Sequence, residues 1–358
     1  MDHRYPLFDE LTQCGHEQLC FHHDPATGLR AIIAIHSTSL GNALGGTRRW
    51  YYESEESAIY DVLRLSRGMT RKAAAAGLPM GGAKSVILKS HRDQERTMAE
   101  ARAMGHFVDT FNGAYIAAED VGVDIQFIDW MAMETKHVMG GETLSRGGDP
   151  SPWTARGAFN GMRACLAHAG REESFEGLTV AIQGVGQVGR NLARMLNDAG
   201  ASLIVSDIEK KKVDAMVEEL GCTAVHPDDI LTTECDILAP CALGAAINGG
   251  TVPHLRCGIL CGAANNILDD PEEDAVALKT AGILYGPDFV VNAGGLIELA
   301  GLHLGMSREE LNTRNDAIYD TTRSVLRDSE TQESTFAAAV ALADARISEG
   351  RQEQVHAG

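Results

Sequence analysis

Three glycines in the middle of the chain, within Gly184–Gly189, follow the spacing Gly-x-Gly-x-x-Gly. Residues 178–183, directly before them, form a short apolar and β-branched run, and residues 187–199 carry apolar side chains at helical spacing. A second apolar run, 202–206, ends at Asp207, eighteen residues beyond the last glycine. The order strand, glycine turn, helix, strand and acid is typical of a doubly wound parallel α/β sheet that binds a dinucleotide.

Each glycine of this fingerprint has its own physical role. Gly184 permits a tight turn, Gly186 lets the backbone approach a pyrophosphate, and Gly189 lets the helix lie close to the strand. Free N–H groups and the positive dipole at the start of the helix favour phosphates. The alternative, a purely structural glycine turn, does not account for the acid at the end of the second strand. We therefore expect the cofactor to contact Gly184, Val185, Gly186, Gln187, Val188, Gly189 and Asp207.

The acid also predicts which dinucleotide is bound. A carboxylate at the end of the second strand accepts hydrogen bonds from both ribose hydroxyls and repels a 2′-phosphate, which favours NAD over NADP. Three lysines, Lys210 to Lys212, follow closely and could indicate NADP instead. A lysine run early in a helix is usually a solvated face, and Asp207 is the more directly placed group. NAD is therefore the predicted cofactor.

The length and charge of the chain limit its class and its partners. At 358 residues it exceeds one typical domain, so two domains are expected. A formal net charge of −19 argues against nucleic acid and against an anionic membrane as partners. No apolar run approaches the roughly 20 residues that a membrane span needs, and the N-terminus lacks the apolar core of a signal peptide. We expect a cytoplasmic protein.

The eight cysteines and thirteen histidines do not follow a metal-binding pattern. No Cys-x-x-Cys pair occurs, and no His-x-x-x-His or other ligand spacing stands out. The cysteines are interpreted as small buried apolar side chains in a reducing compartment. No metal is predicted.

The first half of the chain has the pattern of a separate α/β domain. Two apolar runs, 17–22 and 29–36, flank a turn and predict a β-hairpin, and Ser54 followed by two acids predicts a helix start. Further along, the sequence predicts a turn at 79–83, strands at 85–88 and 114–118, and a helix over 95–111. Residues 140–152, rich in glycine, serine and proline, are the expected domain boundary.

This boundary divides the chain into residues 1–149 and 150–324, with helices at about 325–358 expected to return to the first domain. Beyond Asp207, further strand candidates continue the second domain. They lie at residues 236–239, 258–261 and 282–285. Their cadence completes a doubly wound sheet.

Two lysines and one aspartate in the first half are candidates for chemistry. Lys72 ends an amphipathic helix, Lys84 lies between a Gly-Gly turn and an apolar strand, and Asp120 follows a strand end. If both ammonium groups face one cleft, each disfavours the other's charge, and burial lowers a pKa further toward neutrality. One lysine could then hold a substrate carboxylate while the other moves protons, and the aspartate could anchor an ammonium. Alternatively, the lysines are solvated and Glu119–Asp120 is an exposed loop pair.

Many segments of the chain match, in order, the motifs of one known family. They are residues 29–36, 40–46, 63–70, 72, 75–77, 81–84, 118–122 and 148–152, the glycine fingerprint, and residues 236–244, 263–266 and 291–295. On these segments, from about Gly15 to about Leu299, the chain resembles the NAD-dependent amino-acid dehydrogenases of the leucine, valine and phenylalanine group. These enzymes are relatives of glutamate dehydrogenase. The resemblance is strongest to the leucine dehydrogenases.

The resemblance implies a role for each candidate. Lys72 would bind the α-carboxylate of an amino acid with the help of an asparagine amide, and Asp120 would hold the amino group. Lys84 would be the general base and acid acting on the water that attacks the imine. Thr154 would lie near the nicotinamide carboxamide, or would be an ordinary N-cap of the helix that follows. The resemblance further assigns Gly41, Ala118 and Asn266 to the substrate and Cys241, Ala242, Ala263 and Asn265 to the cofactor.

Four apolar positions predict the substrate's side chain. In the glutamate-specific relatives a lysine and a serine receive the distal carboxylate, whereas the corresponding residues here are Leu40 and Leu299. An unpaired buried carboxylate would cost several kcal/mol there, which argues against glutamate. An apolar pocket is expected from Leu40, Met69, Leu296 and Leu299, unless these side chains are plain core. Leucine at positions 296 and 299 favours aliphatic over aromatic substrates.

Some residues depart from the family's pattern. Asn42 stands where proline is expected, Ala83 where a third glycine is common, and Arg49 where an apolar residue is usual. Glu298, beside the predicted pocket, could admit a polar or cationic substrate, or could face solvent. These departures bear on selectivity and assembly more than on chemistry.

The resemblance therefore implies a homo-oligomer, from dimer to octamer, with the active site in the cleft between two domains. The first domain would bind the substrate and form the subunit contacts. The expected reaction is the reversible, NAD-dependent oxidative deamination of leucine, valine or isoleucine to the 2-oxo acid and ammonia. The alternatives are an aromatic amino-acid dehydrogenase, for phenylalanine or tryptophan, and a non-catalytic NAD-binding protein.

Overall fold

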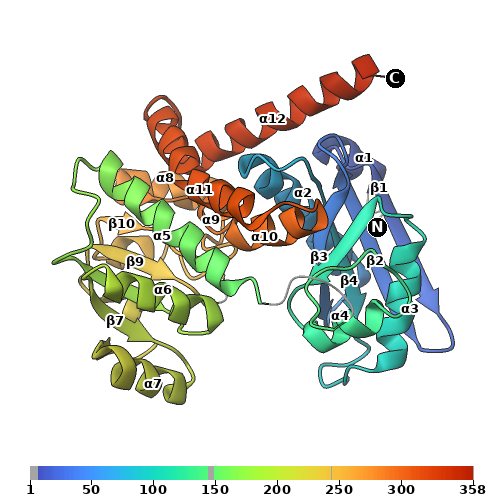
Figure 1. Cartoon of the computed structure of the whole chain (residues 1–358), viewed down its shortest axis with the longest axis horizontal. Helices are drawn as coiled ribbons and strands as arrows, with labels where there is room; N and C mark the ends of the chain where they lie inside the picture. The colour runs from blue at the N-terminus through green and yellow to red at the C-terminus, as the bar shows by residue number, and fades with distance from the viewer. Residues whose placement is uncertain (1–6, 144–148, 243, 358) are drawn as a thin grey trace, which may run out of the picture. The chain divides into compact units, whose positions relative to one another are not determined.

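The computed structural model describes residues 7–143, 149–242 and 244–357, which form two compact units with a β-sheet each (Figure 1). The first unit takes its described residues from Met1–Asp149, Leu299–Met306 and Ala343–Gly358, and the second from Pro150–Glu298 and Ser307–Leu342. The assignment of the C-terminal helices to the two units thus differs from the expectation that residues 325–358 return to the first domain. The return to the first unit begins only at Ala343, and the short segment Leu299–Met306 joins that unit as well.

The first unit is built on a five-stranded mixed sheet. Its strands are β1 (Gln18–Asp24), β2 (Leu29–Ser37), β3 (Ala43–Trp50), β4 (Gly81–Leu88) and β5 (Tyr115–Glu119), in the spatial order β1-β2-β4-β3-β5. Strands β1 and β2 form the predicted antiparallel hairpin, and β2 also pairs antiparallel with β4. Strand β3 runs parallel to both of its neighbours, β4 and β5. This arrangement sets side chains from β3, β4 and β5 side by side.

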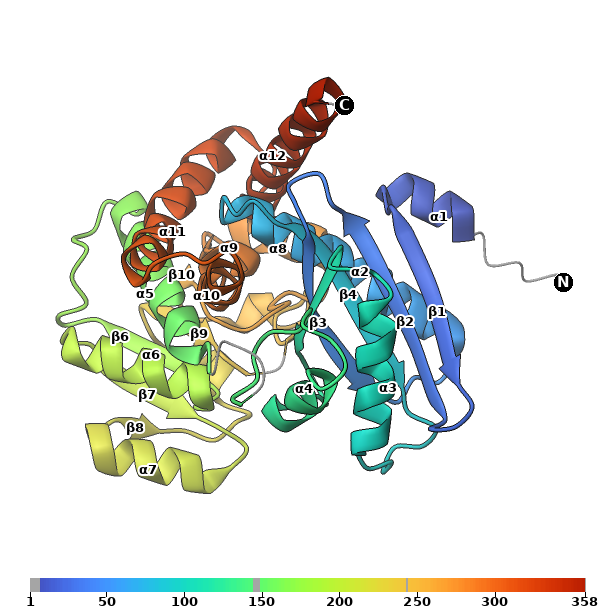
Figure 2. The ribbon, with the colours of Figure 1, turned by 45° about the vertical axis from the view of Figure 1, so that its right-hand side comes forward.

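Helices cover both faces of this sheet (Figure 2). They are α1 (Leu7–Cys14), α2 (Glu55–Ala75), α3 (Met98–Asp109) and α4 (Ile125–Met131). Successive residues of β2 point to opposite faces, so Ile33 packs with α3 and α4 while Ile32 packs with α2. Strand β2 is therefore buried on both sides, which explains its almost continuous apolar sequence, whereas the edge strand β1 is partly exposed.

Helix α2 begins as the sequence predicts, but strand β4 begins earlier. Ser54 caps α2 in a capping box with Ser57. The predicted turn at 79–83 is wrong in its second half, because β4 starts at Gly81 and Lys84 lies inside the strand. Gly82 permits this close packing of β4 on α2, since a Cβ there would come within 2.0 Å of the backbone nitrogen of Thr70.

The second unit contains a six-stranded sheet whose described strand pairs are all parallel. Its strands are β6 (Thr179–Gln183), β7 (Ser202–Ser206), β8 (Thr223–Ala224), β9 (Ile237–Pro240), β10 (Ile259–Leu260) and β11 (Leu284–Tyr285), in the order β11-β10-β9-β6-β7-β8. This is the doubly wound order of dinucleotide-binding sheets, and the predicted fold is confirmed. Strand β9 is shifted by one residue from its predicted range, and β10 and β11 lie within theirs but are shorter.

The remaining helices belong mainly to the second unit. They are α5 (Ser151–His168), α6 (Gln187–Asp198), α7 (Lys210–Leu220), α8 (Pro271–Thr280), α9 (Asp288–Val291) and α11 (Arg308–Asp328), with short 3-10 turns at Ile230–Thr232, Val252–His254 and Ser329–Thr331. Helices α10 (Gly294–His303) and α12 (Thr335–Ala357) contribute residues to both units. Helix α11 stays with the second unit because Asp316 accepts hydrogen bonds from Arg156 at 2.7 Å and Asn160 at 3.2 Å, both on α5.

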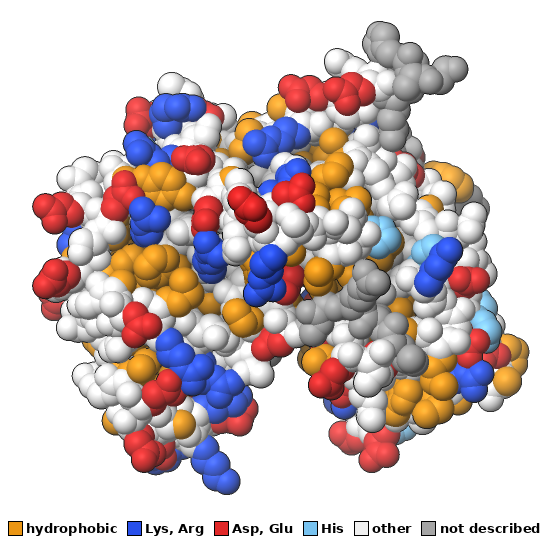
Figure 3. Space-filling model, viewed as in Figure 1, with side chains coloured by type: hydrophobic (Ala, Val, Ile, Leu, Met, Phe, Trp, Pro, Cys, Tyr) orange, Lys and Arg blue, Asp and Glu red, His pale blue; other side chains and the backbone are white. Residues whose placement is uncertain are grey.

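The surface carries charges of both signs. On the face shown in Figure 3, acidic and basic side chains are interspersed. An exposed ion pair joins Lys210 to Asp214 at 2.6 Å. Within the part of the chain that the structure describes, no helix is long and apolar enough to cross a membrane. All eight cysteines are free thiols, three of them buried and five half-buried, so their burial is less complete than expected.

Candidate active site

Lys84 and Asp120 meet across strand β3 of the first sheet. Lys84 lies in β4, and Asp120 directly follows β5. The distance from Lys84 Nζ to Asp120 Oδ2 is 3.1 Å, and the two side chains are only 6% and 17% exposed. The alternatives of a solvated lysine and an exposed acidic loop are therefore wrong for this pair.

A glycine of β3 provides the space for this contact. Gly46 pairs with Ala118 of β5. A Cβ at Gly46 would lie 3.1 Å from Lys84 Nζ and 2.9 Å from Asp120 Cβ. It would also come within 2.6 Å of the carbonyl oxygen of Glu119, which cannot move without disturbing β5. Bare backbone beneath the pair is what lets the two charged side chains approach each other.

Three further residues of this cluster were missed from the sequence. Arg48 of β3 donates from Nε to Asp120 Oδ2 at 2.8 Å and from Nη1 to Asp61 Oδ2 at 2.9 Å. The Tyr52 hydroxyl donates to the same Asp61 oxygen at 2.8 Å. One signal was present in the sequence: Arg48 stands two residues beyond Gly46, so both face the same side of the strand.

Burial and neighbouring charges shift the pKa of both members of the pair. Burial lowers the pKa of Lys84, and the positive Arg48 lowers it further against the opposing effect of Asp120. Burial alone would raise the pKa of Asp120, but Lys84 and Arg48 hold it down at about 2. Asp120 is therefore ionised near neutral pH, and Lys84 loses its proton more readily than a free lysine. The cation that the structure places beside Lys84 is Arg48, whereas the sequence argument expected a second lysine.

The other predicted substrate residues of the first unit come from several elements. Lys72 and Met69 lie one turn apart near the end of α2, Leu40 and Gly41 lie between β2 and β3, and Ala118 is buried in β5. Leu40 packs against the C-terminal helix, because a Cβ at Gly350 of α12 would lie 2.6 Å from Leu40 Cδ2. Part of the C-terminal helix therefore shapes the surroundings of a predicted substrate contact.

Leu296 and Leu299 lie on α10, and both are buried. Glu298, between them, is only 5% exposed, so the alternative in which it faces solvent is wrong. The apolar pocket expected from these leucines with Leu40 and Met69 stays a prediction.

The glycine fingerprint forms the turn between β6 and α6 of the second unit. Gly184 has a φ of +93°, and a Cβ there would lie 2.8 Å from Ala242. Gly189 packs against the same turn, since a Cβ added at this position would lie 2.0 Å from the carbonyl oxygen of Gly184. Gly186 is the N-cap of α6, and no described atom lies within 4 Å of a Cβ placed there. The turn thus leaves room for a pyrophosphate at the start of the helix.

Asp207 follows β7 beside this turn. Its two carboxylate oxygens accept the backbone N–H groups of Val185 and Glu209, both at 2.9 Å. Each oxygen keeps a further lone pair that a ribose hydroxyl can use. Lys212, one of the lysines that suggested NADP, is paired with Glu209 at 2.5 Å. The residues present therefore fit a dinucleotide with a free 2′-hydroxyl.

The other predicted cofactor residues follow the carboxyl ends of the neighbouring strands, where doubly wound sheets bind ligands. Cys241 and Ala242 follow β9, and Ala263 and Asn265 follow β10; Asn266, which was predicted to contact the substrate, stands next to Asn265. Asn265 Oδ1 accepts a hydrogen bond from Asn292 Nδ2 at 3.0 Å, which fixes its amide. Asn266 has a φ of +52°, an uncommon conformation for a residue other than glycine.

Thr154 lies in the first turn of α5 and not at its N-cap. The helix begins at Ser151 with Pro150 in the capping position, so the ordinary N-cap interpretation of Thr154 is wrong. The Thr154 hydroxyl donates to the Pro150 oxygen at 3.3 Å, and a Cβ at Gly295 would lie 2.6 Å from it.

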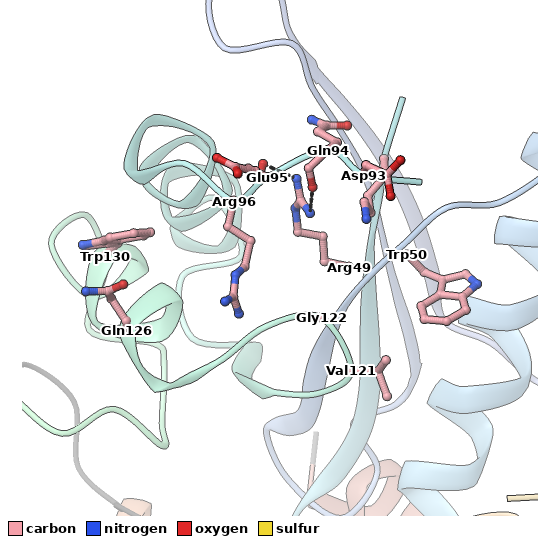
Figure 4. Close-up of a pocket in the computed structure, with 11 residues that line it drawn as sticks. Arg49, Trp50, Asp93, Gln94, Glu95, Arg96, Val121, Gly122, Gln126 and Trp130 are labelled. Carbon is pink, nitrogen blue, oxygen red and sulfur yellow. Dashed lines mark hydrogen bonds between the residues drawn. The ribbon is translucent and has the colours of Figure 1, made fainter. Parts of the chain in front are cut away.

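A separate hollow of about 570 Å³ lies on the first unit (Figure 4). Its lining includes Trp50, Lys89, Arg96, Gly122 and Trp130, but none of the predicted site residues among those the structure describes. Arg49 also lines it, and this departure from the family's pattern has a structural explanation. Its guanidinium is buried, pairs with Glu100 at 2.9 Å, and donates to the backbone carbonyls of Gln94 and Glu95.

Three family models match the sequence. The model described as "Glu/Leu/Phe/Val dehydrogenase, dimerisation domain" matches residues 16–137, and "Glutamate/Leucine/Phenylalanine/Valine dehydrogenase" matches residues 202–353. The model "D-isomer specific 2-hydroxyacid dehydrogenase, NAD binding domain" matches residues 155–244, which include the glycine fingerprint.

Individual proteins match over almost the whole chain. Leucine dehydrogenase from Bacillus cereus is 45% identical over 343 residues, which cover 95% of this chain and 93% of that protein. The crystal structure of L-tryptophan dehydrogenase from Nostoc punctiforme is similar with a TM-score of 0.84 at 39% identity, covering 96% of this chain and 99% of that one. The hetero-hexameric glutamate dehydrogenase from Thermus thermophilus shares the fold, with a TM-score of 0.77 at 21% identity over 95% of this chain and 90% of that one.

These matches confirm the predicted family, and they extend over both units of the structure. The matched residues include the fingerprint turn of the second unit and both Lys84 and Asp120 of the first. The chain belongs to the Glu/Leu/Phe/Val dehydrogenase family and is an amino-acid dehydrogenase.

Proposed function

We propose that the protein catalyses the reversible oxidative deamination of a branched aliphatic L-amino acid, with NAD as the electron acceptor. The observation that carries the chemistry is the buried Lys84–Asp120 pair beside Arg48. A lysine whose pKa is lowered can take a proton from water and later return one, as the hydrolysis of an imine requires. Asp120, with a pKa of about 2, keeps the negative charge that an amino group needs.

In the proposed reaction Lys72 binds the α-carboxylate, assisted by the Asn266 amide, and Asp120 holds the amino group. The nicotinamide, when bound, supplies the acceptor for the hydride that leaves the substrate Cα. Lys84 takes a proton from the water that attacks the resulting iminium carbon. It then returns this proton to the departing nitrogen and accepts the proton of the new hydroxyl group as the C–N bond breaks, so that ammonia and a 2-oxo acid are released.

For the cofactor we propose that Gly184–Gly189 holds the pyrophosphate and that Asp207 accepts the ribose hydroxyls. The open backbone at Gly186 and the position of Asp207 beside Val185 support this assignment. The remaining contacts of the dinucleotide are assigned to Thr154, Cys241, Ala242, Ala263 and Asn265.

The branched aliphatic substrate rests on Leu40, Met69, Leu296 and Leu299, together with the identity to a protein named leucine dehydrogenase. An aromatic amino acid is the second candidate, because a relative at 39% identity is named L-tryptophan dehydrogenase. Apolar pockets discriminate by only about 1–3 kcal/mol per methylene, so direct comparison of substrates is required.

We further propose a homo-oligomer formed through the first unit, because residues 16–137 match a dimerisation-domain model. Light scattering should give a mass that is a multiple of the 38.3 kDa chain. A monomer at micromolar concentration would contradict this assembly.

The function is tested by following NAD reduction with purified protein across the twenty L-amino acids at mildly alkaline pH. Turnover with leucine, valine or isoleucine that exceeds turnover with phenylalanine and tryptophan supports the proposal. A preference for an aromatic substrate would agree with the proposed reaction but would contradict the assignment of an aliphatic pocket. Protein that binds NAD but turns over none of the twenty would overturn the proposed reaction, and Lys84→Ala is the background control.

A further inference from the structure

Arg48 binds two carboxylates at once, one inside the proposed site and one outside it. Its Nε contacts Asp120 Oδ2 at 2.8 Å, and its Nη1 contacts Asp61 Oδ2 at 2.9 Å. We propose that Arg48 is a positioning residue: it orients Asp120 and, balanced by Asp61, sets the electrostatic field in which Lys84 exchanges its proton. The inference deepens the proposed function, because it rests on the roles given there to Lys84 and Asp120.

The geometry brings two cations to one oxygen. Arg48 Nε and Lys84 Nζ both contact Asp120 Oδ2, so the two nitrogens lie no more than about 6 Å apart. At this distance in a partly buried site, charges interact more strongly than in water. With Oδ2 engaged by two cations, Oδ1 of Asp120 is the oxygen that can receive a substrate amino group. Arg48 therefore fixes both the orientation of the acid and the charge beside the lysine.

Asp61 limits the charge that Arg48 presents. It lies on α2, is 16% exposed at its side chain, and also accepts hydrogen bonds from the Tyr52 hydroxyl at 2.8 Å and from Arg64 at 3.2 Å. Because Asp61 and Lys72 share helix α2, the Arg48–Asp61 contact also ties the strand under the pair to the helix that carries Lys72. Arg48 thus connects three elements of the first unit.

The charged groups facing Lys84 come from each element packed around it. Asp120 follows β5, Arg48 lies on β3 and Asp61 lies on α2. Two further titratable groups lie next to these residues. The Tyr52 hydroxyl donates a hydrogen bond to Asp61, and Glu119 precedes Asp120 in the sequence. Arg48 lowers the pKa of Lys84, whereas Asp61 raises it. Neutralising Arg48 should therefore raise the pKa of Lys84, and neutralising Asp61 should lower it.

This opposition gives a test that a merely structural role would fail. The acid limb of the pH profile of kcat/KM, measured with the best amino acid of the panel, reports the deprotonation of Lys84. In Arg48→Gln the limb should move up by about one pH unit, and in Asp61→Asn it should move down. Arg48→Lys keeps the charge, so its limb should stay at the wild-type pH even where kcat falls. Arg64→Gln removes an arginine that also binds Asp61 but is 40% exposed, and it should leave the limb in place.

A second readout needs no turnover. The pH dependence of trace labelling by acetic anhydride, quantified by mass spectrometry on the peptide that contains Lys84, reports the same deprotonation.

Shifts of opposite sign in Arg48→Gln and Asp61→Asn support the inference in either measurement. An unmoved midpoint in Arg48→Gln, or shifts of the same sign in both variants, would overturn it. If Arg48→Gln fails to fold, the downward shift in Asp61→Asn decides alone. Wild-type protein that is inactive on every amino acid contradicts the proposed function, while the labelling still judges Arg48.

Discussion

Arg71 of α2 and Asp344 of α12 form a two-pronged ion pair, with Nε–Oδ1 and Nη2–Oδ2 distances of 3.0 Å each. Two residues further along α12, Arg346 Nη1 donates to the carbonyl oxygens of Ala74 and Ala75 at 2.8 and 2.7 Å. The last carbonyls of a helix lack partners within the helix, and a cation suits the negative end of its dipole. The C-terminal helix therefore holds the end of α2, close in sequence to Lys72.

Replacing Arg346 with alanine should destabilise the protein by about 1–3 kcal/mol, because two carbonyl oxygens lose a charged donor. The free energy of unfolding in urea measures this effect. Arg327→Ala is the matched control, since the Arg327–Asp328 pair is largely exposed and its loss should change little. Equal unfolding energies for both variants would contradict the role assigned to Arg346.

Gly46→Ala should reduce kcat/KM by at least about 100-fold, because small misplacements of reacting groups have effects of that size. The added methyl group would press on Lys84 Nζ and on the Glu119 carbonyl oxygen. Gly68→Ala, on α2, is the control, because no described atom lies within 4 Å of a Cβ added at this position. This substitution should stabilise the helix by up to about 1 kcal/mol. Near-normal activity of Gly46→Ala would show that bare backbone is not needed there.

Asp207→Ala should raise KM for NAD by about 10- to 100-fold and increase the relative use of NADP, since a lost charge-assisted hydrogen bond is worth about 1.5–3 kcal/mol. Steady-state kinetics with both dinucleotides measure the change. Asp214→Ala, which removes the acid paired with Lys210, should leave the ratio unaltered. A wild-type enzyme that prefers NADP would refute the role of Asp207.

The stability of the protein should fall as the pH decreases below about 6.5, the usual value for a free histidine. His36 is buried between Thr70 and the Cys14 carbonyl, and burial with the adjacent His16 lowers its pKa to about 3. Between these two pH values the histidine is protonated in the unfolded chain but neutral in the folded protein. The free energy of unfolding therefore falls by up to about 1.4 kcal/mol for each pH unit of acidification. Urea unfolding at pH 7.5 and pH 5 should give a smaller difference for His36→Gln than for the wild type. An unchanged difference would exclude His36 as the source.

Glu100→Gln should destabilise the first unit by about 3–5 kcal/mol, because it leaves the buried Arg49 guanidinium without a counter-charge. Glu53→Gln, which breaks an exposed ion pair with Arg92, should have little effect. Thermal unfolding of the two variants distinguishes a buried ion pair from a surface one, and similar melting temperatures would contradict the assignment.

The sequence predicts well where local rules dominate. The fingerprint turn needs only the spacing from Gly184 to Gly189 and a nearby acid, and the capping of α2 needs only Ser54 and its neighbours. The sequence predicts the start of β4 four residues too late, at Ser85 and not at Gly81, because a Gly-Gly pair is typical of a turn. In the structure Gly82 instead makes room for Thr70 of α2, a packing contact between a helix and a strand that residue spacing does not reveal.

The site itself required information that spacing does not contain. Lys84 and Asp120 stand 36 residues apart, and only the parallel pairing of β4, β3 and β5 explains how they meet. Arg48 lies just beyond the matched segment 40–46, and its two carboxylate partners come from a helix and from the end of a strand. The division of the C-terminal helices between the units depends on contacts such as that of Asp316 with α5, which no helical pattern reveals.

The contact of Leu40 with Gly350 has a practical consequence for anyone who wishes to change what this enzyme accepts. A mutagenesis library confined to residues that touch the ligand would treat α12 as an inert tail. Yet any side chain larger than hydrogen at position 350 would displace Leu40 or the Ser39 carbonyl, and would thereby alter the predicted apolar pocket without touching the substrate. Fusion partners, affinity tags and truncations near residue 350 therefore belong among the variables of such an experiment, on equal terms with the mutations themselves.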